Sequence, residues 1–185
     1  MSALDLQLVL DAQHSVTAAA WSQALAIFFA RWAIFLNLGL GLILIVSRVK
    51  RARHAVLEVA WSVAVSALFV ALIAFMVQRP RPFMAASGVV ALIPPPISTA
   101  FPSGHTSVAV AMAIAFAHAD PRIGLISCVI AGLVAFGRIS AGVHYPTDIL
   151  GGVLVGLASF GVVRVIHAQL KRRDVARSAR QHQHE

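Results

Sequence analysis

The feature that most limits how this chain can fold is an apolar run over residues 59–77 that contains no charged side chain. About 20 apolar residues in a helix cross the hydrocarbon core of a bilayer. Hydrophobic residues make up 59% of the 185-residue chain and charged residues only 12%. Soluble domains are about half apolar and about a quarter charged. We therefore expect an integral membrane protein.

Four further apolar stretches accompany this run, and together they predict an all-α, polytopic transmembrane helical bundle of about five spans. The first stretch covers about residues 21–46 and contains Arg31, a charge that should face protein, water or a lipid headgroup. The last three stretches cover about residues 103–119, 123–139 and 148–166. Glycines in the later stretches suit close helix packing in lipid: Gly132, Gly151, Gly152 and Gly156.

Basic residues distinguish the two sides of this bundle. The chain has 15 Lys and Arg against 7 Asp and Glu, and most of the cations follow the first span or the last. They are Arg48, Lys50, Arg51 and Arg53, and then Lys171, Arg172, Arg173, Arg177 and Arg180. Cytoplasmic loops are enriched in Lys and Arg, so five spans place both regions in the cytoplasm. Because the cations flank apolar runs, the positive charge indicates a membrane topology and no nucleic-acid partner.

The same reasoning divides the chain into three parts. Residues 1–20 contain no Lys or Arg, and we expect them to form an interfacial helix on the outer face. Residues 21–168 form the transmembrane domain. Residues 169–185 form a basic cytoplasmic tail, which we expect to be disordered or to lie along anionic lipid.

Three segments on the predicted outer face carry polar residues that are unusual between spans. The first is Arg79-Pro80-Arg81-Pro82, the second is Pro102-Ser103-Gly104-His105, and the third runs from Arg138 through His144 to Asp148. Arginines on the outer side oppose the positive-inside bias. A guanidinium group stays charged and offers a planar set of donors that fits phosphate oxygens. These arginines therefore indicate a phosphate site.

The second and third segments add groups that can carry out chemistry. Ser103 is predicted to be the N-cap of a helix, whose free backbone N–H groups favour an anion. His105 stands on the same turn, within reach of a leaving oxygen. Asp148 follows His144 by four residues and can accept its far ring N–H, which leaves the other nitrogen free to attack. Each feature alone more often caps a helix or anchors it at the interface, but their joint occurrence on one face indicates a catalytic site.

These segments resemble the signature motifs of the type-2 phosphatidic acid phosphatase superfamily. The motifs read Lys, six residues, Arg-Pro; then Pro-Ser-Gly-His; then Ser-Arg, five residues, His, three residues, Asp. The resemblance covers about residues 75–148 and is greatest to the bacterial undecaprenyl diphosphatase branch. It implies a metal-independent lipid phosphatase without a cofactor. It also implies catalytic roles for His144 as nucleophile, His105 as acid and Asp148 as orienting partner, and phosphate binding by Arg81, Arg138, Ser103 and Gly104.

Two positions depart from the family pattern. The Lys of the first motif would fall at Ala74, and we expect the nearby Arg79 to replace it as a phosphate-binding cation. The Ser of the third motif is Gly137. Arg31 has two interpretations, an arginine that extends to the outer surface or a further contact with the substrate's phosphates.

The favoured function is hydrolysis of a polyprenyl diphosphate at the outer face of a bacterial inner membrane, with the lipid phosphate and membrane lipids as the partners. An enzyme that hydrolyses phosphatidate or phosphatidylglycerophosphate is the nearest alternative, and a phosphotransferase is chemically close. A non-catalytic lipid-phosphate binder or transporter is an alternative of a different class. It has no use for an acid and a nucleophile, and His105 and His144 argue against it.

Overall fold

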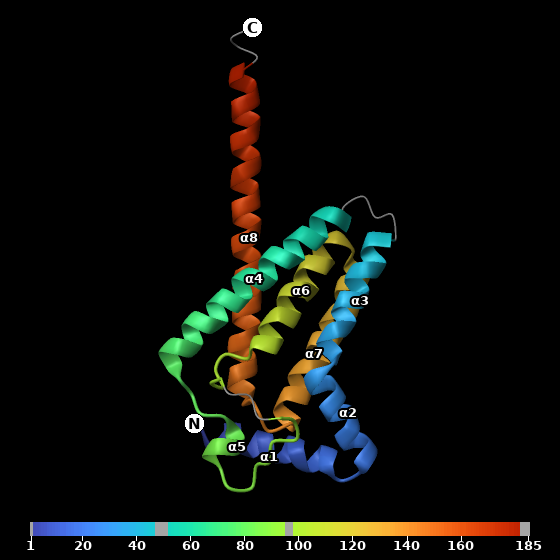
Figure 1. The fold of residues 1–185 in the computed structure, drawn as a ribbon, viewed down its shortest axis with the longest axis vertical. Helices are drawn as coiled ribbons and strands as arrows, with labels where there is room; N and C mark the ends of the chain where they lie inside the picture. Colours follow the sequence, from blue (N-terminus) through green and yellow to red (C-terminus); the bar gives the residue numbers. More distant parts are fainter. Residues whose placement is uncertain (1, 47–51, 95–97, 182–185) are drawn as a thin grey trace.

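The computed structural model describes residues 2–46, 52–94 and 98–181, and the regular elements in those ranges are all helices (Figure 1). They are α1 (Ala3–Thr17), α2 (Ala20–Arg31), α3 (Ala33–Val46), α4 (Ala52–Val77), α5 (Pro82–Ala85), α6 (Gly104–Ala119), α7 (Pro121–Ser140) and α8 (Pro146–Gln181). The all-α prediction is confirmed. The residues expected between the first two spans, Arg48, Lys50 and Arg51, lie outside the described residues.

Side-chain caps and prolines define where several helices begin. The hydroxyl of Ser2 accepts a hydrogen bond from the Asp5 N–H at 3.1 Å and caps α1. Asp120 caps α7 by accepting the backbone N–H groups of Arg122 and Ile123 at 2.8 and 3.2 Å. Pro121 follows this cap at the start of α7, where a missing N–H breaks no helical hydrogen bond.

Three helical segments are long and apolar enough to cross a bilayer: Val56–Ala85, Pro121–Ser140 and Pro146–Arg173. The pair α2 and α3 qualifies as a fourth, but it bends by 57° at the break after Arg31. α6 is apolar with 16 residues, which is shorter than the roughly 20 that a straight span needs. Within the described residues the fold therefore contains three or four candidate spans, and the expected count of five is not reached.

α6 is the central helix and packs against α4, α7 and α8. Two glycines of α8 make the α6–α8 contact close. A Cβ atom at Gly152 would lie 2.7 Å from the Ser103 carbonyl oxygen, and one at Gly156 would lie 2.6 Å from that of Ser107. A Cβ at Gly132 would have no neighbour within 4 Å. The prediction of close helix packing is therefore confirmed for Gly152 and Gly156 and wrong for Gly132.

α1 lies across the end of the bundle near α5, at the opposite end from the C-terminus (Figure 1). It buries one face through residues spaced three or four apart, which include Asp5, Val9, Gln13 and Val16. The Gln13 side chain holds the segment after α5, because its amide donates to the Val90 carbonyl at 2.6 Å and accepts the Val90 N–H at 3.0 Å.

α8 extends well beyond the bundle (Figure 1). We expected residues 169–185 to be disordered or to lie along lipid, but the helix continues to Gln181. The disorder prediction is therefore wrong for the described part of this tail. The many basic residues suggested an unstructured segment, yet residues such as Arg and Lys are good helix formers, and they extend a helix that packing has already started.

Candidate active site

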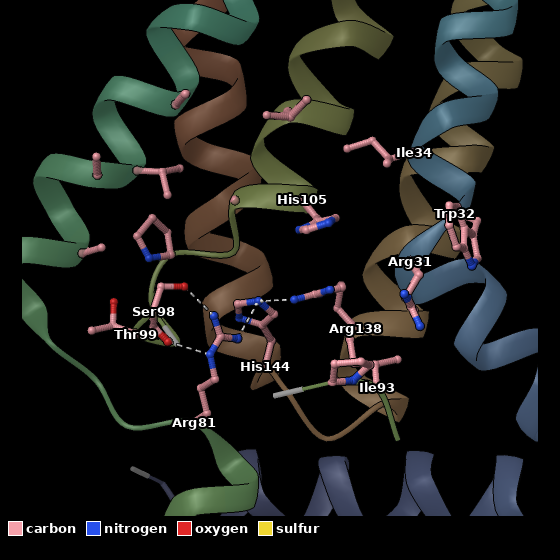
Figure 2. Close-up of a pocket in the computed structure, with 18 of the residues that line it drawn as sticks. Arg31, Trp32, Ile34, Arg81, Ile93, Ser98, Thr99, His105, Arg138 and His144 are labelled. Carbon is pink, nitrogen blue, oxygen red and sulfur yellow. Dashed lines mark hydrogen bonds between the residues drawn. The ribbon is translucent and has the colours of Figure 1, made fainter. Parts of the chain in front are cut away.

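A cavity of about 810 Å³ opens beside α6, at the end of the bundle near α1 (Figure 2). Its polar wall contains Arg31, Arg81, His105, Arg138 and His144. Gly104 and the loop residues Ser98 and Thr99 also line it. The apolar wall comes from α3, α4 and α6: Ile34, Phe35, Ala67, Val70, Ala71, Ala74 and Val108. The fold thus brings four of the predicted site side chains and Gly104 to one cavity.

Arg81 stands just before α5, between two prolines, and only 3% of its surface is exposed. Its Nε donates to the carbonyl oxygen of Ser98 at 2.7 Å, and its Nη2 donates to the Ser98 hydroxyl at 3.0 Å. Its Nη1 donates to the Val143 carbonyl at 2.7 Å. These three bonds fix the plane of a cationic group at the cavity wall.

Arg138 lies in the last turn of α7 and is also buried. Its Nη1 donates to the carbonyl oxygen of Ala30 at 3.2 Å, while its buried Nε has no hydrogen-bond partner in the described structure. The preceding Gly137 explains one departure from the family motif. A Cβ there would lie 2.5 Å from the Ala30 backbone nitrogen, so α2 approaches too closely for a serine.

His144 lies in the connection between α7 and α8, and its two ring nitrogens have different neighbours. Nδ1 lies 2.7 Å from the carbonyl oxygen of Ala100. Nε2 lies 3.2 Å from Nη1 of Arg81 and 3.4 Å from Nη2 of Arg138 (Figure 2). A carbonyl only accepts and a guanidinium only donates, so both sides select the tautomer with the proton on Nδ1. The lone pair is then on Nε2.

The charge state of His144 follows from its surroundings. Burial lowers the pKa of His144 to about 4, and the positive charges of Arg138 and Arg81 act in the same direction. The carboxylate of Asp148 opposes this shift but does not outweigh it. At neutral pH the ring is therefore uncharged, as a nucleophile must be.

Asp148 lies in the first turn of α8 and is fully buried. Its Oδ2 lies 3.6 Å from Nδ1 of His144, which is too long for a hydrogen bond. That oxygen accepts the Tyr145 N–H at 2.8 Å, and Oδ1 accepts Nη1 of Arg79 at 2.6 Å. The expected carboxylate–imidazole hydrogen bond is therefore not formed, because the Ala100 carbonyl takes the ring proton. The negative charge nevertheless remains close to the ring.

Two predicted phosphate ligands point away from the cavity. Arg79 donates to Asp5 at 2.8 Å and to Asp148 at 2.6 Å, and it is not among the residues that line the cavity. The prediction that it replaces the missing Lys is thus not supported, since two carboxylates hold its guanidinium elsewhere. Ser103 occupies the predicted N-cap position, but its hydroxyl pairs with that of Thr106 at 3.0 Å and makes no capping bond.

Sequence reasoning left several cavity residues unidentified or ambiguous. Arg31 lines the cavity, with its guanidinium 5.3 Å from the centre of the Trp32 ring. Ala74, where the family's Lys would stand, lines the same cavity. Thr99 has a buried hydroxyl without a partner in the described structure. A hydroxyl in a loop, such as that of Thr99, belongs to no recognisable sequence motif. A backbone carbonyl such as that of Ala100 cannot be identified from the sequence, because every residue has one.

Comparison with known proteins places this geometry in a family. Residues 55–172 match the family model described as the PAP2 superfamily. Undecaprenyl-diphosphatase BcrC of Bacillus subtilis is 40% identical over 86 residues, which cover 46% of this chain and 44% of BcrC. Phosphatidylglycerophosphatase B of Bacillus subtilis is 34% identical over 86 residues, which cover 40% of this chain and 42% of that protein. The matched part of the chain thus spans less than half the length of either relative.

The fold agrees with the sequence match. The crystal structure of Aquifex aeolicus LpxE superimposes with a TM-score of 0.73 at 25% identity, and the match covers 88% of this chain and 95% of that one. The family match includes more than half of the chain and all three polar segments, of which the second supplies His105 and the third supplies His144 and Asp148. The chain therefore belongs to the PAP2 superfamily.

Proposed function

We propose that this protein is a metal-independent lipid phosphatase that converts a polyprenyl (undecaprenyl) diphosphate to the monophosphate through a phosphohistidine. The observation that carries the proposal is the Nε2 atom of His144. This atom carries the lone pair of the ring and lies within 3.4 Å of two buried arginines that face the same cavity. A nucleophile between two fixed cations suits attack on a phosphoryl group.

In the first step, Nε2 of His144 attacks the terminal phosphorus and forms a P–N bond. The bond from phosphorus to the bridging oxygen breaks, and His105, which lines the same cavity, donates a proton to that oxygen. Arg81 and Arg138 bind the phosphoryl oxygens, and the unpartnered Nε of Arg138 gains an acceptor. The ring of His144 becomes cationic, and the Asp148 carboxylate stabilises it from 3.6 Å.

In the second step, water attacks the phosphohistidine. His105, now neutral, takes a proton from that water, the P–N bond breaks, and inorganic phosphate leaves. His144 returns to its neutral form with the proton still on Nδ1, where the Ala100 carbonyl holds it. Both histidines then have their starting charges, so the cycle needs no other reactant.

The cavity also supports a diphosphate lipid as substrate. Arg31 is a third cation at its wall, beside Arg81 and Arg138, and a diphosphate carries more negative charge than a monoester. The apolar wall between α3 and α4 offers small side chains, among them Ala67 and Ala71, past which an isoprenoid tail can extend into lipid. The similarity to undecaprenyl-diphosphatase BcrC supports the same substrate class.

The proposed topology has five spans over residues 21–168: α2 with α3, α4, α6, α7 and α8. α1 lies in the interface on the outer face of a bacterial inner membrane, beside the cavity, and the basic end of α8 lies in the cytoplasm. The distribution of Lys and Arg supports this orientation. The short α6 fits the arrangement because α4, α7 and α8 pack against it, so that protein takes the place of lipid around it.

A phosphatase for phosphatidylglycerophosphate or phosphatidate remains the second candidate, and the similarity to phosphatidylglycerophosphatase B favours it. It would use the same nucleophile and two arginines. The two candidates differ in Arg31, because a monoester leaves this cation without a phosphate partner.

A panel of substrates tests the proposed function. Purified protein in detergent is supplied with undecaprenyl diphosphate, phosphatidate and phosphatidylglycerophosphate at equal surface concentration, and kcat/KM is measured from released phosphate. We expect the diphosphate to give the highest value. Arg31→Gln should reduce that value about tenfold to a hundredfold, because a charge-assisted contact contributes about 1.5–3 kcal/mol. Arg31→Lys should lose less.

The matched control is Arg122→Gln, which removes an exposed arginine at the other end of α7. It should leave all three substrates unchanged. Faster turnover of phosphatidylglycerophosphate or phosphatidate, with Arg31→Gln affecting every substrate equally, would favour the second candidate. Tight binding of lipid phosphates without any phosphate release would identify a non-catalytic binder.

A further inference from the structure

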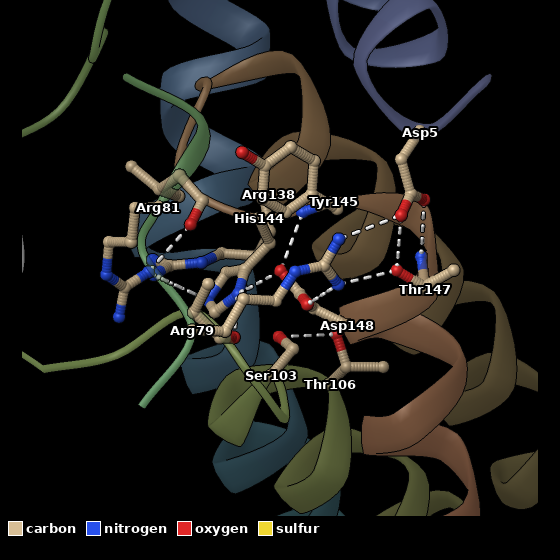
Figure 3. A network of polar contacts seen from close by, with 12 residues as sticks. Asp5, Arg79, Arg81, Ser103, Thr106, Arg138, His144, Tyr145, Thr147 and Asp148 are labelled. Carbon is tan, nitrogen blue, oxygen red and sulfur yellow. Dashed lines mark hydrogen bonds and ion pairs between the residues drawn. The ribbon is translucent and has the colours of Figure 1, made fainter. Parts of the chain in front are cut away.

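A chain of charged side chains connects α1 to the proposed catalytic carboxylate (Figure 3). Asp5 of α1 is 4% exposed and accepts Nη2 of Arg79 at 2.8 Å. Nη1 of the same arginine donates to Asp148 Oδ1 at 2.6 Å and to the hydroxyl of Thr147 at 2.6 Å. The Arg79 guanidinium also lies 4.2 Å from the centre of the Tyr145 ring.

Asp5 is tied to the start of α8 by a second route. Its Oδ1 accepts the Thr147 N–H at 3.2 Å, and its Oδ2 accepts the Thr147 hydroxyl at 2.7 Å. Burial alone would raise the pKa of Asp5, but the hydrogen bonds from Thr147 and Arg79 lower it overall. Asp5 is therefore ionised at neutral pH. Burying a carboxylate is costly unless partners compensate its charge.

We infer that Asp5 is a positioning residue for the proposed reaction: by balancing the charge of Arg79, it keeps the negative charge of Asp148 effective at His144. The inference rests on the proposed function, since it takes His144 as the nucleophile. Neither Asp5 nor Arg79 lines the cavity in which the substrate is proposed to bind. Their effect passes through Asp148.

The charges of the trio explain the role. Asp5, Arg79 and Asp148 together carry one negative charge, which lies beside a ring that turns cationic when it attacks phosphorus. Without Asp5, Arg79 would neutralise Asp148 and the trio would have no net charge. The cationic ring of the intermediate would then lose the net negative charge on its Asp148 side, and between buried groups such as Asp148 and His144 this loss is weakly screened.

The experiment compares five full-length proteins in detergent: wild type, Asp5→Asn, Arg79→Met, the double variant, and Asp11→Asn. Asp11 lies exposed on the same helix, so Asp11→Asn makes the same chemical change outside the network. The rate of phosphohistidine formation is measured by rapid quench, using the lipid phosphate that the wild type hydrolyses fastest, and KM is measured at steady state.

We expect Asp5→Asn to slow phosphorylation about tenfold, with KM within about twofold of the wild type and Asp11→Asn unchanged. The double variant restores the wild-type net charge of the trio. It should therefore phosphorylate faster than Asp5→Asn, although it has lost three more hydrogen bonds. A purely structural network predicts the reverse order, so a double variant slower than Asp5→Asn, or an Asp5→Asn variant as fast as the wild type, would overturn the inference.

A second measurement separates this inference from the proposed function. Diethyl pyrocarbonate reacts with an unprotonated imidazole nitrogen, and mass spectrometry locates the product on His144 without any lipid substrate. We expect the carbethoxylation rates to rank the variants in the same order as the phosphorylation rates. If the wild type hydrolyses no lipid on the panel, the proposed function fails. The order of the carbethoxylation rates alone then tests the inference about Asp5, and a different order would overturn it.

Discussion

The Nδ1 atom of His144 lies 2.7 Å from the carbonyl oxygen of Ala100, so the main chain holds the ring proton. In catalytic histidines this task commonly belongs to a carboxylate. Here the nearest carboxylate oxygen, Oδ2 of Asp148, lies 3.6 Å away and accepts a backbone N–H instead. The tautomer and the electrostatic stabilisation of His144 therefore have separate sources, and substitutions can distinguish them.

Asp148→Asn should remove the charge and keep the tautomer. We expect kcat to fall about a hundredfold, because a charge-assisted contact of about 1.5–3 kcal/mol is lost from the cationic intermediate. The phosphoryl group should still form on Nε2, since Ala100 keeps Nδ1 protonated. The position is determined from the phosphohistidine isomer in an alkaline digest. Phosphate on Nδ1 in this variant would mean that Asp148, and not Ala100, selects the tautomer.

The acidic limb of the pH profile reports the protonation of His144. Burial and two arginines lower the pKa of His144 to about 4, and only the neutral ring can attack. The value of kcat/KM reports the free enzyme, so it should fall as the pH drops through about 4 and not through the ordinary value near 6.5. The ionisation of the substrate phosphate is measured by ³¹P NMR in the same micelles, and the kcat/KM profile is corrected for it. An enzymatic limb near 6.5 would contradict this environment for His144.

Much of the site could be predicted because its reactive groups are side chains, which the sequence shows directly. His105, Arg81, Arg138 and His144 line one cavity, as the placement of the three segments on one predicted face indicated. Their roles in catalysis stay predictions. The carbonyl of Ala100 could not be found in this way, because every residue has one and only the fold determines which carbonyl meets the ring.

Arg79 and Arg31 show why charge alone does not identify a ligand. Arg79 lies within the first motif, but its carboxylate partners, Asp5 and Asp148, come from two distant parts of the chain. Those contacts depend on α1 crossing the end of the bundle, which no local pattern predicts. Arg31 lies inside an apolar stretch, and the 57° bend after it brings it to the cavity. No Gly or Pro in the sequence marks that break.

Gly152 tests whether the close contact between α6 and α8 supports the site. A Cβ there would lie 2.7 Å from the Ser103 carbonyl and 3.1 Å from Cβ of Thr106. Gly152→Ala should therefore lower the free energy of unfolding by about 1–3 kcal/mol, seen as a lower thermal midpoint in detergent. Gly132→Ala has no neighbour to meet within 4 Å and should keep or slightly raise stability. Equal midpoints for the two variants would show that α8 can shift without loss.

Labelling of introduced cysteines tests the proposed orientation. Cys128 is the chain's one cysteine, so the background is Cys128→Ser. Ser87 and Ser178 are exposed near opposite ends of the fold. In intact cells an impermeant thiol reagent should label Ser87→Cys and leave Ser178→Cys unlabelled until the membrane is opened. The opposite pattern would place the cavity on the cytoplasmic face.

During turnover, we expect Nε2 of His144 to carry the phosphoryl group. The direct measurement is an alkaline quench of the enzyme with undecaprenyl diphosphate labelled at the terminal phosphate, followed by digestion and mass spectrometry. We predict label on the peptide that contains His144, as the Nε2 isomer, together with complete loss of label and turnover in His144→Gln. Full turnover by His144→Gln, or label on a different residue, would show that His144 is not the nucleophile.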